Sequence, residues 1–578
     1  MVCVFKTLNL LEIIMIPYKH IFPAFLLFVF SLSSYAQDFI LPLDIPPLLS
    51  ADFGDLRSNH FHSGLDFKTQ SVENKPVFAV SDGYVSRVNI SPGGYGLALY
   101  ITHPNGYTTV YGHLNRFSKK IADYAKQKQY EQESFRVDIY LKPNEIPVKK
   151  GERVALSGNT GGSGGPHLHF EFRDTKTEEV IDPLDFFAKQ ITDTRRPEVQ
   201  GISFYPMAGQ GVINQSASPL RLPLTQTKSG TPSALARTVQ AWGQIGLGVK
   251  AFDRMNGTAN TYGVKYVRLF VDGKRVFSST MDRFSFDKTR MLNAFTDFDE
   301  YRTNKSFYMR SFVEPGNTLP FYETVNNGVI NINEERVYNF RYELQDNAGN
   351  QTEYSFSIKG VKQAIPPLPA CDNYKNWAVK NLYVTADFTL NIMPGNLYED
   401  LCYIHKTIIS QKYHSNIQQV NDKIVPLHKN GTIWLKIKNV NPANVIQYGI
   451  ISIDRRGKEE WVGGKYRDGG VEASIRELGA MYAVDLDTVA PVIMPINPTQ
   501  WTQRGRIVIQ LTDDKSGIAF ARGEIDGKFA LFTNDVKSKN YIYEFDDARL
   551  AKGQNHTLVF TATDGAGNKS VYNYQFMY

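Results

Sequence analysis

The sequence predicts a mainly β protein with several domains. Aromatic residues make up 13% of the chain and glycines number 44, a composition that favours strands separated by many turns. Short runs of alternating apolar residues end repeatedly at Gly or at Asn-Gly and Asp-Gly pairs. A length of 578 residues is enough for about three to five domains. The 42% apolar and 21% charged fractions are typical of folded globular chains.

The N-terminus has the pattern of a secretory signal peptide. Lys19 precedes an apolar run over residues 21–32, and small residues lead to Ala36. The run is too short for a comfortable membrane span. We therefore expect residues 1–36 to be removed after Ala36, with Met15 as a second candidate start, whereas an uncleaved anchor is the alternative. After cleavage the protein is predicted to be exported to the periplasm, cell envelope or medium, and not to be an integral membrane protein.

Charge and cysteine content narrow the function further. The net charge of +6 is small for this length, and no Lys/Arg-rich run interleaved with aromatics predicts nucleic-acid binding. Cys3 lies before or within the predicted signal segment. Cys371 and Cys402 remain, and in an exported chain they either form one disulfide or stay as separate thiols.

The first predicted domain covers residues 37–190 and is all-β with one insertion. "HPNGY", which begins at His103, places Asn-Gly between two alternating runs and predicts a hairpin. The stretch 117–135, "FSKKIADYAKQKQYEQESF", is rich in Lys, Gln and Ala and predicts a short polar helix. Such an insertion either walls a groove or forms a solvated surface helix.

The later part of the chain predicts further β domains, two of them related. Segments 195–360 and 488–578 contain, in the same order, a Val/Ile-Asp-Gly-Lys hairpin and an Asp-X-Ala-Gly-Asn turn, which predicts two β-sandwich, Ig-like units. These Asp- and Asn-rich turns could bind calcium, but tight-turn geometry is the favoured explanation. Segment 370–486 is also strand-rich and matches the repeat poorly.

Two distant stretches hold the residues that suggest chemistry. "HFHSGLDF" contains His62 and Asp66, and "GGPHLHFEF" contains His167 and His169. On a strand, spacings of two and four place side chains on one face, so Leu168 would point to the opposite side. Two imidazoles and a carboxylate with one position open are the ligands of a catalytic zinc, although each half alone is a weak signal.

The order of several motifs gives a specific resemblance. "HFHSGLDF", "VFAVSDGYV", "GYGLALYITHPNGYTTVYGHL", "VKKGERVALSGNTGGSGGPHLHFEF" and "DPLDF" follow one another over residues 46–187. Together they resemble the lysostaphin/LytM-type zinc endopeptidases, which cut peptide cross-links of peptidoglycan. The resemblance implies that one Zn²⁺ ion is bound by three residues and that two more line the catalytic centre. The ligands are His62, Asp66 and His169, and the lining residues are His113 and His167. The interval after His113 is long for this family.

The chemistry that follows is hydrolysis by a zinc-activated water. Zinc lowers the pKa of bound water from about 15.7 to roughly 7. His113 and His167 are suited to hold that water, to stabilise the oxyanion or to pass a proton to the leaving amine, and the sequence does not assign these tasks between them. The glycines before His167 either let the backbone approach a substrate or form a flexible turn. His60 is expected to be a bystander and His103 to be structural.

The sequence therefore predicts an exported zinc metalloendopeptidase whose substrate is the peptide part of peptidoglycan. The alternatives are a non-catalytic, peptidase-like regulator and a wall-binding scaffold or adhesin formed by the later β domains. A regulator of this type typically lacks some of the metal ligands, and all are present here. Oligomeric state is not addressed by any pattern in the chain.

Overall fold

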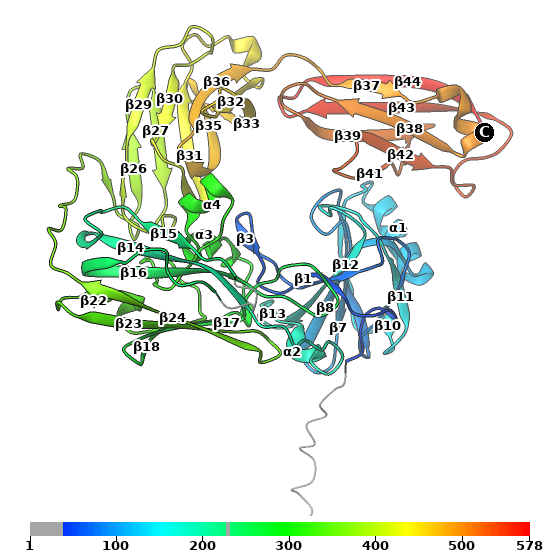
Figure 1. Ribbon diagram of the computed structural model, residues 1–578. Coiled ribbons are helices and arrows are strands. Elements are labelled where there is room, and N and C mark those ends of the chain that lie inside the picture. The colour runs from blue at the N-terminus through cyan, green and yellow to red at the C-terminus, as the bar shows by residue number, and fades with distance from the viewer. Residues whose placement is uncertain (1–38, 227–231) are drawn as a thin grey trace, which may run out of the picture. The chain divides into compact units, whose positions relative to one another are not determined.

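The computed structural model describes residues 39–226 and 232–578 (Figure 1). The predicted signal peptide, residues 1–36, and Cys3 lie outside these residues. Strands dominate the described chain and its helices are short, which confirms the mainly β fold class. Within the described ranges, no helix is long and apolar enough to cross a membrane.

The N-terminal region is built on an antiparallel sheet whose main path runs β1-β4-β12-β8-β7-β6-β10. Shorter strands branch from this path, and β2 pairs with β3 beside it. Its strands are β1 (Leu49–Ala51), β2 (Leu56–Arg57), β3 (His60–Phe61), β4 (Leu65–Lys68), β5 (Pro76–Phe78), β6 (Gly83–Ile90), β7 (Leu97–Thr102), β8 (Tyr107–Phe117), β9 (Val137–Tyr140), β10 (Pro147–Val148), β11 (Arg153–Ser157), β12 (His167–Asp174) and β13 (Val180–Ile181). The predicted hairpin at "HPNGY" joins β7 to β8.

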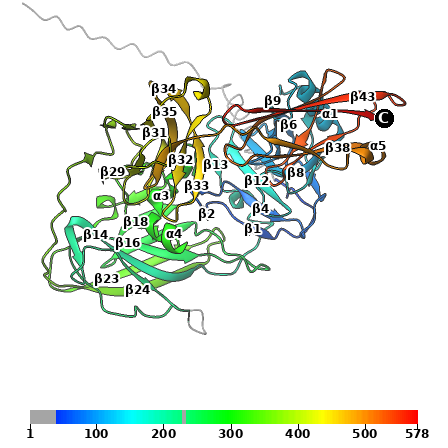
Figure 2. The same ribbon diagram turned by 90° about the horizontal axis from the view of Figure 1, so that it is seen from above.

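Strand β12 lies between β4 and β8 (Figure 2). His169 of β12 is directly opposite Asp66 of β4 and Gly112 of β8. Leu168 and Phe170 point to the other face and are fully buried in the apolar core. The predicted alternation of "HLHF" is therefore confirmed, and it places polar side chains on one face of the sheet and the core on the other.

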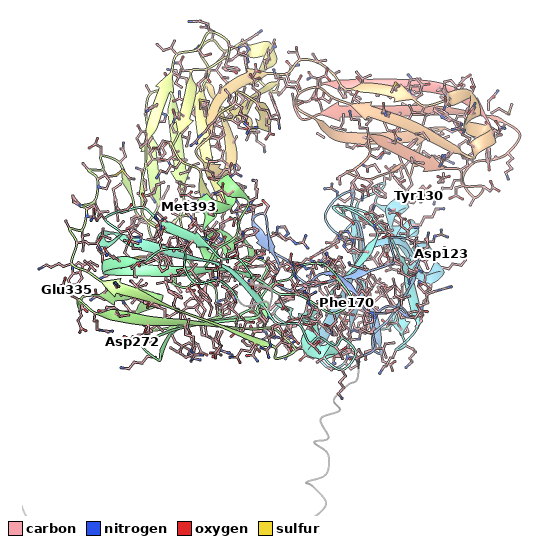
Figure 3. All side chains as sticks on the ribbon, in the orientation of Figure 1. Asp123, Tyr130, Phe170, Asp272, Glu335 and Met393 are labelled. Carbon is pink, nitrogen blue, oxygen red and sulfur yellow. A yellow bond between two sulfur atoms is a disulfide. The ribbon has the colours of Figure 1, made fainter. Side chains whose placement is uncertain are left out.

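The predicted helical insertion is α1 (Lys119–Glu131), between β8 and β9. Ile121, Ala125 and Gln129 are its buried residues, and their spacing of four places them on one helical face. Asp123, labelled in Figure 3, is on the exposed side, where it pairs with Lys119. The helix thus packs along one stripe and presents a charged surface elsewhere. A second helix, α2 (Leu184–Phe187), ends this region.

The next region shares its apolar core with the first. Phe53, Phe61 and Val180 belong to the same buried cluster as the strands that follow residue 198. Strand β13 also pairs with β19, Arg283–Phe284, of the second region. The second region holds β14 (Glu198–Ile213), β15 (Leu220–Pro223), β16 (Gln240–Phe252), β17 (Tyr266–Val271), β18 (Lys274–Thr280), β20 (Met309–Arg310), β21 (Tyr322–Thr324), β22 (Ile330–Ile332), β23 (Val337–Gln345) and β24 (Gln351–Gly360), with α3 (Leu292–Phe295) and α4 (Phe298–Asn304).

The third region has two five-stranded sheets around one core. Cys371 and Cys402 are joined by a disulfide, which decides between the two alternatives for this pair. One sheet holds β26 (Asn381–Val384), β27 (Phe388–Ile392), β31 (Val425–Lys436), β35 (Gly470–Leu478) and β34 (Lys465–Arg467); the other holds β29 (His405–Ile408), β30 (Ile417–Val420), β36 (Met481–Leu486), β32 (Tyr448–Ile453) and β33 (Glu459–Gly463); and β25 (Tyr374–Lys375) pairs with β28 (Leu401–Cys402).

The C-terminal region has two four-stranded sheets around its own core. One sheet holds β37 (Val492–Pro495), β38 (Arg506–Thr512), β42 (Asn540–Glu544) and β41 (Thr533–Asn534), and the other holds β40 (Lys528–Ala530), β39 (Ile518–Ile525), β43 (Asn555–Asp564) and β44 (Lys569–Met577), with α5 (Trp501–Arg504) between β37 and β38. The two predicted Asp-Gly hairpins are present. Asp272-Gly273 joins β17 to β18 and Asp526-Gly527 joins β39 to β40, all four residues with positive φ, as a tight hairpin turn requires.

His103 gives the N-terminal region a testable response to acid. Its ring is buried, with Nδ1 2.8 Å from the Asp82 carbonyl oxygen and Nε2 2.9 Å from the Thr109 hydroxyl, and burial lowers its pKa. Below about pH 6.5 the unfolded chain gains a proton there that the folded chain does not, so stability falls as pH drops through this range. We expect His103→Gln to flatten this loss by up to about 1.4 kcal/mol per pH unit. Calorimetric unfolding at several pH values tests it, and equal pH dependence in variant and wild type would contradict it.

Candidate metal centre

Three side chains from two strands and a loop converge at one end of the N-terminal sheet. His62 Nε2 is 3.0 Å from Asp66 Oδ1 and 3.1 Å from His169 Nδ1, and the last two atoms are 2.9 Å apart. All three residues are buried. Tetrahedral bonds of about 2.0–2.1 Å place ligand atoms about 3.3 Å apart, so these donors fit one zinc ion. The structure thus brings together the three residues that the resemblance implied as ligands.

Each imidazole is held by a hydrogen bond from its other nitrogen. His62 Nδ1 donates to the Asp52 carbonyl oxygen at 2.5 Å, and His169 Nε2 donates to Glu171 Oε1 at 2.9 Å. These bonds fix the tautomers and leave the lone pairs of His62 Nε2 and His169 Nδ1 directed at the common point. Such outer partners orient metal ligands and raise their basicity.

Glu171 is a residue of the site that the sequence reasoning missed. It is fully buried, its Oε1 accepts hydrogen bonds from Ser63 and Tyr95 at 2.5 Å each, and its Oε2 accepts one from Arg173 at 2.8 Å. Although burial raises it, the charge of Arg173 and the hydrogen bond from His169 hold the pKa of Glu171 well below its usual range. Glu171 is therefore ionised and anchors the His169 ring.

A signal for Glu171 was present in the sequence. In "HLHFEFR" every second residue from His167 to Arg173 is polar and every intervening residue is apolar. Because side chains alternate along a strand, His167, His169, Glu171 and Arg173 share one face of β12. Continuing this alternation beyond His169 would have added Glu171 and then Arg173 to the predicted site.

The carboxylates make the centre attractive to a cation. Burial raises the pKa of Asp66, but the charge of His62 and hydrogen bonds from the histidines lower it well below its usual range. Burial lowers the pKa of His169, yet the hydrogen bonds and charges of Asp66 and Glu171 raise it to about 9 in the metal-free protein. Two ionised carboxylates thus stabilise positive charge at the point where the three donors meet.

His113 and His167 lie beside the three donors. His113 Nδ1 donates to the Thr160 carbonyl oxygen and His167 Nδ1 to the Gly165 carbonyl oxygen, each at 2.8 Å. Their ring centroids are 4.7 Å apart, and His167 Nε2 is 3.5 Å from Asp66 Oδ1. Burial, followed by the neighbouring histidines, lowers the pKa of His113 to about 3, so this ring is neutral at neutral pH.

The backbone at His113 is in an unusual conformation. Its φ is +57°, in the left-handed region, and the pairing of β7 with β8 shifts register at this place. The His113 amide leaves the ladder and donates to the Tyr95 carbonyl oxygen at 2.8 Å. A bulge of this kind turns a side chain out of the regular alternation. The irregularity therefore aims the His113 ring at the centre.

Gly161 is required by the packing of the two loops that hold His113. Its φ is +71°, and a Cβ on it would lie 2.4 Å from the Gly96 nitrogen and 2.5 Å from the Gly94 carbonyl oxygen. Any side chain would push apart the loop of Tyr95 and the loop of Thr160, whose carbonyl oxygens fix His113. This gives a structural reason for a glycine here, whereas approach of the loop to a substrate stays a prediction.

His60, close to His62 in sequence, does not join the centre. His60 is exposed, and its Nδ1 contacts the Ser58 carbonyl oxygen at 2.9 Å. Between it and His62, Phe61 is buried in the core shared with the second region. His60 therefore lies two residues from a candidate ligand while its own ring stays outside the donor set.

Family models match two parts of the chain. One described as Peptidase family M23 matches residues 60–130, and one described as a Zu5-like domain matches residues 372–487. The solved catalytic domain of lysostaphin from Staphylococcus simulans is 23% identical and aligns over 25% of this chain and 92% of its own, with a TM-score of 0.19.

Curated relatives match about a fifth of the chain. An uncharacterised metalloprotease of Haemophilus influenzae is 39% identical over 19% of this chain and 18% of its own length. The DD-carboxypeptidase/endopeptidase Mpg of Neisseria meningitidis is 33% identical over 20% and 21%, and the peptidoglycan DD-endopeptidase ShyB of Vibrio cholerae is 35% identical over 19% and 20%. The chain thus spans about a fifth of the length of these relatives. The family match over residues 60–130 confirms the predicted resemblance of the N-terminal domain to peptidase family M23.

Replacing Glu171 tests whether it supports metal binding. Glu171→Gln keeps an oxygen for His169 Nε2 but removes the charge that raises the basicity of the ring, so we expect zinc affinity to fall about 10- to 100-fold. Competition with a chromophoric chelator measures it. The matched control is Glu178→Gln, because Glu178 pairs with the same Arg173 from an exposed position. Equal zinc affinity in the two variants would contradict this role.

Proposed function

We propose that the protein is an exported zinc metalloendopeptidase that hydrolyses the peptide cross-links of peptidoglycan. The observation that carries the proposal is the convergence of His62 Nε2, Asp66 Oδ1 and His169 Nδ1 within 2.9–3.1 Å of one another, beside the buried His113 and the partly buried His167. Relatives of this domain include proteins named peptidoglycan DD-endopeptidases, which supports peptidoglycan as the substrate class. Action on the cell wall agrees with the predicted export.

The chain offers three protein ligands and leaves further coordination open, as in catalytic zinc sites. A bound zinc ion would supply a Lewis acid for the scissile carbonyl and a water of lowered pKa. The protein's own part is to hold the ligands. The Asp52 carbonyl and Glu171 fix the two imidazoles, and the ionised Asp66 supplies the anionic ligand.

His113 and His167 are placed to move protons. Because Nδ1–H of each ring is donated to a backbone carbonyl, each neutral ring presents a lone pair at Nε2. Such a nitrogen accepts a proton from the attacking water, and the resulting imidazolium donates it to the oxyanion or to the leaving amine. The low pKa of His113 makes this ring a weak proton acceptor but, once protonated, a strong proton donor.

Metal-ligand variants test the proposed activity against the two alternatives. We expect His62→Ala and His169→Ala to lose zinc and to abolish release of peptides from purified sacculi, measured by mass spectrometry of the soluble fragments. His60→Ala is the matched control, because its ring is exposed and outside the donor set. If zinc-loaded wild-type protein binds sacculi and releases no peptide, a regulator or a wall-binding scaffold replaces the proposal.

Variants of His113 and His167 should differ from the metal-ligand variants in their zinc content. We expect His113→Ala and His167→Ala to bind about one zinc per chain and to lose roughly 10²- to 10⁴-fold in kcat, because they act on protons and not on the metal. Zinc content by atomic emission and turnover of a defined muropeptide measure the two effects. Loss of zinc together with activity would assign these residues to metal binding instead.

A further inference from the structure

A second group of acidic side chains lies in the second region of the chain, apart from the metal centre. One carboxylate oxygen of each of Asp193, Asp253 and Asp346 lies within 4.8 Å of the others. Asp193 precedes β14, Asp253 follows the end of β16, and Asp346 follows β23 at the start of the Asp-Asn-Ala-Gly-Asn turn. Three segments distant in sequence thus contribute one carboxylate each.

The three carboxylates line a cavity of about 50 Å³. This space is large enough for an ion or a water molecule. Asp253 is only 4% exposed, and its Oδ1 has no hydrogen-bond partner among the described residues. A buried carboxylate oxygen without a partner is costly unless it binds a cation or an ordered water. This unpaired oxygen is suited to bind a cation or an ordered water in the cavity.

The charges around the cavity favour a cation. No Lys or Arg side chain forms an ion pair with any of the three carboxylates in the ranges that the structure describes. Burial and the charges of Asp346 and Asp193 raise the pKa of Asp253 to about 8, although a hydrogen bond from the Arg254 amide and the charge of Arg195 lower it in part. Lys265, which also lines the cavity, is already paired with Asp182 and Asp185.

Hydrogen bonds hold the other two carboxylates in place. Asp193 Oδ1 accepts from the amides of Arg195 and Asn256, and Asp346 accepts from the amide and side chain of Asn350. Asn350 also donates to the Asp193 carbonyl oxygen at 3.2 Å. The segment before β14 and the turn after β23 are therefore fixed relative to one another.

We propose that Asp193, Asp253 and Asp346 bind one calcium ion. The donor atoms are all oxygens, which calcium and magnesium prefer, whereas zinc sites are usually built from nitrogen and sulfur ligands. Calcium accepts six to eight oxygens in flexible geometry, so backbone carbonyls and waters can complete a shell begun by three carboxylates, whereas magnesium demands a near-ideal octahedron. The ion would tie the chain between the first two regions to the ends of β16 and β23.

An equivalent cluster in the C-terminal region shows the same arrangement without the unpaired oxygen. Asp487 lies five residues before β37, as Asp193 lies five before β14, and Asp513 and Asp564 correspond to Asp253 and Asp346. None of these carboxylates has a buried oxygen without a partner among the described residues. The proposal is therefore confined to the cluster around Asp253.

Calorimetry of the full chain tests the proposal. Zinc-loaded protein, dialysed free of calcium, is unfolded with and without 5 mM CaCl₂ (about 10⁻³ M or less suffices for many extracellular calcium sites). We expect calcium to raise the unfolding temperature of wild type and of the surface control Asp123→Asn by about 3–5 °C, and to leave Asp253→Asn unchanged. Without calcium, Asp253→Asn should unfold near the wild-type temperature, because the raised pKa keeps most of the Asp253 carboxyl protonated at neutral pH and the amide is similarly uncharged.

Two calorimetric outcomes would refute the proposed calcium site. If calcium does not change the unfolding temperature of the wild-type protein, the cavity holds only water. If calcium raises the unfolding temperature of Asp253→Asn as much as that of the wild type, calcium binds elsewhere. The half-buried Asp193→Asn is a second variant in case Asp253→Asn does not fold. Isothermal titration with CaCl₂ should show one calcium fewer per chain in Asp193→Asn than in wild type, and equal stoichiometry would again refute the proposal.

Discussion

The pairing of β4 with β12 is the constraint on which the candidate site depends. Its register sets His169 opposite Asp66, and a slip of one residue would turn every polar side chain of β12 into the core. The opposite face prevents the slip. Leu168, Phe170 and Phe172 are fully buried, each contributing about 1.5–3 kcal/mol by leaving water. Apolar packing on one side of the sheet thus fixes the positions of the ligand atoms on the other.

Burial of so many charges on the polar face is tolerated because they alternate in sign. A buried carboxylate alone is costly, but Glu171 lies between the His169 ring and Arg173 and also accepts bonds from Ser63 and Tyr95. Each of the two carboxylate oxygens of Glu171 accepts at least one hydrogen bond. Consequently the ligand rings are held before any metal arrives, and little ordering is left for the binding step.

The sequence was informative where structure is local. Period-two alternation predicted the shared face of His167 and His169, and Asn-Gly and Asp-Gly pairs predicted the hairpins. The choice of ligands came from the resemblance to a family and not from spacing. The partners of those ligands were not predictable, because the Asp52 carbonyl and the bulge at His113 depend on loops that meet only in the fold. The same holds for the core that the first two regions share.

That shared core determines how the protein can be divided. Phe61 separates exposed His60 from buried His62, and together with Phe53 and Val180 it packs among strands of the second region. A chain truncated near residue 190 would leave these three side chains in water and release the segment that carries His62. A fragment that preserves the geometry of the site must therefore include the second region, which is part of the scaffold of the N-terminal domain.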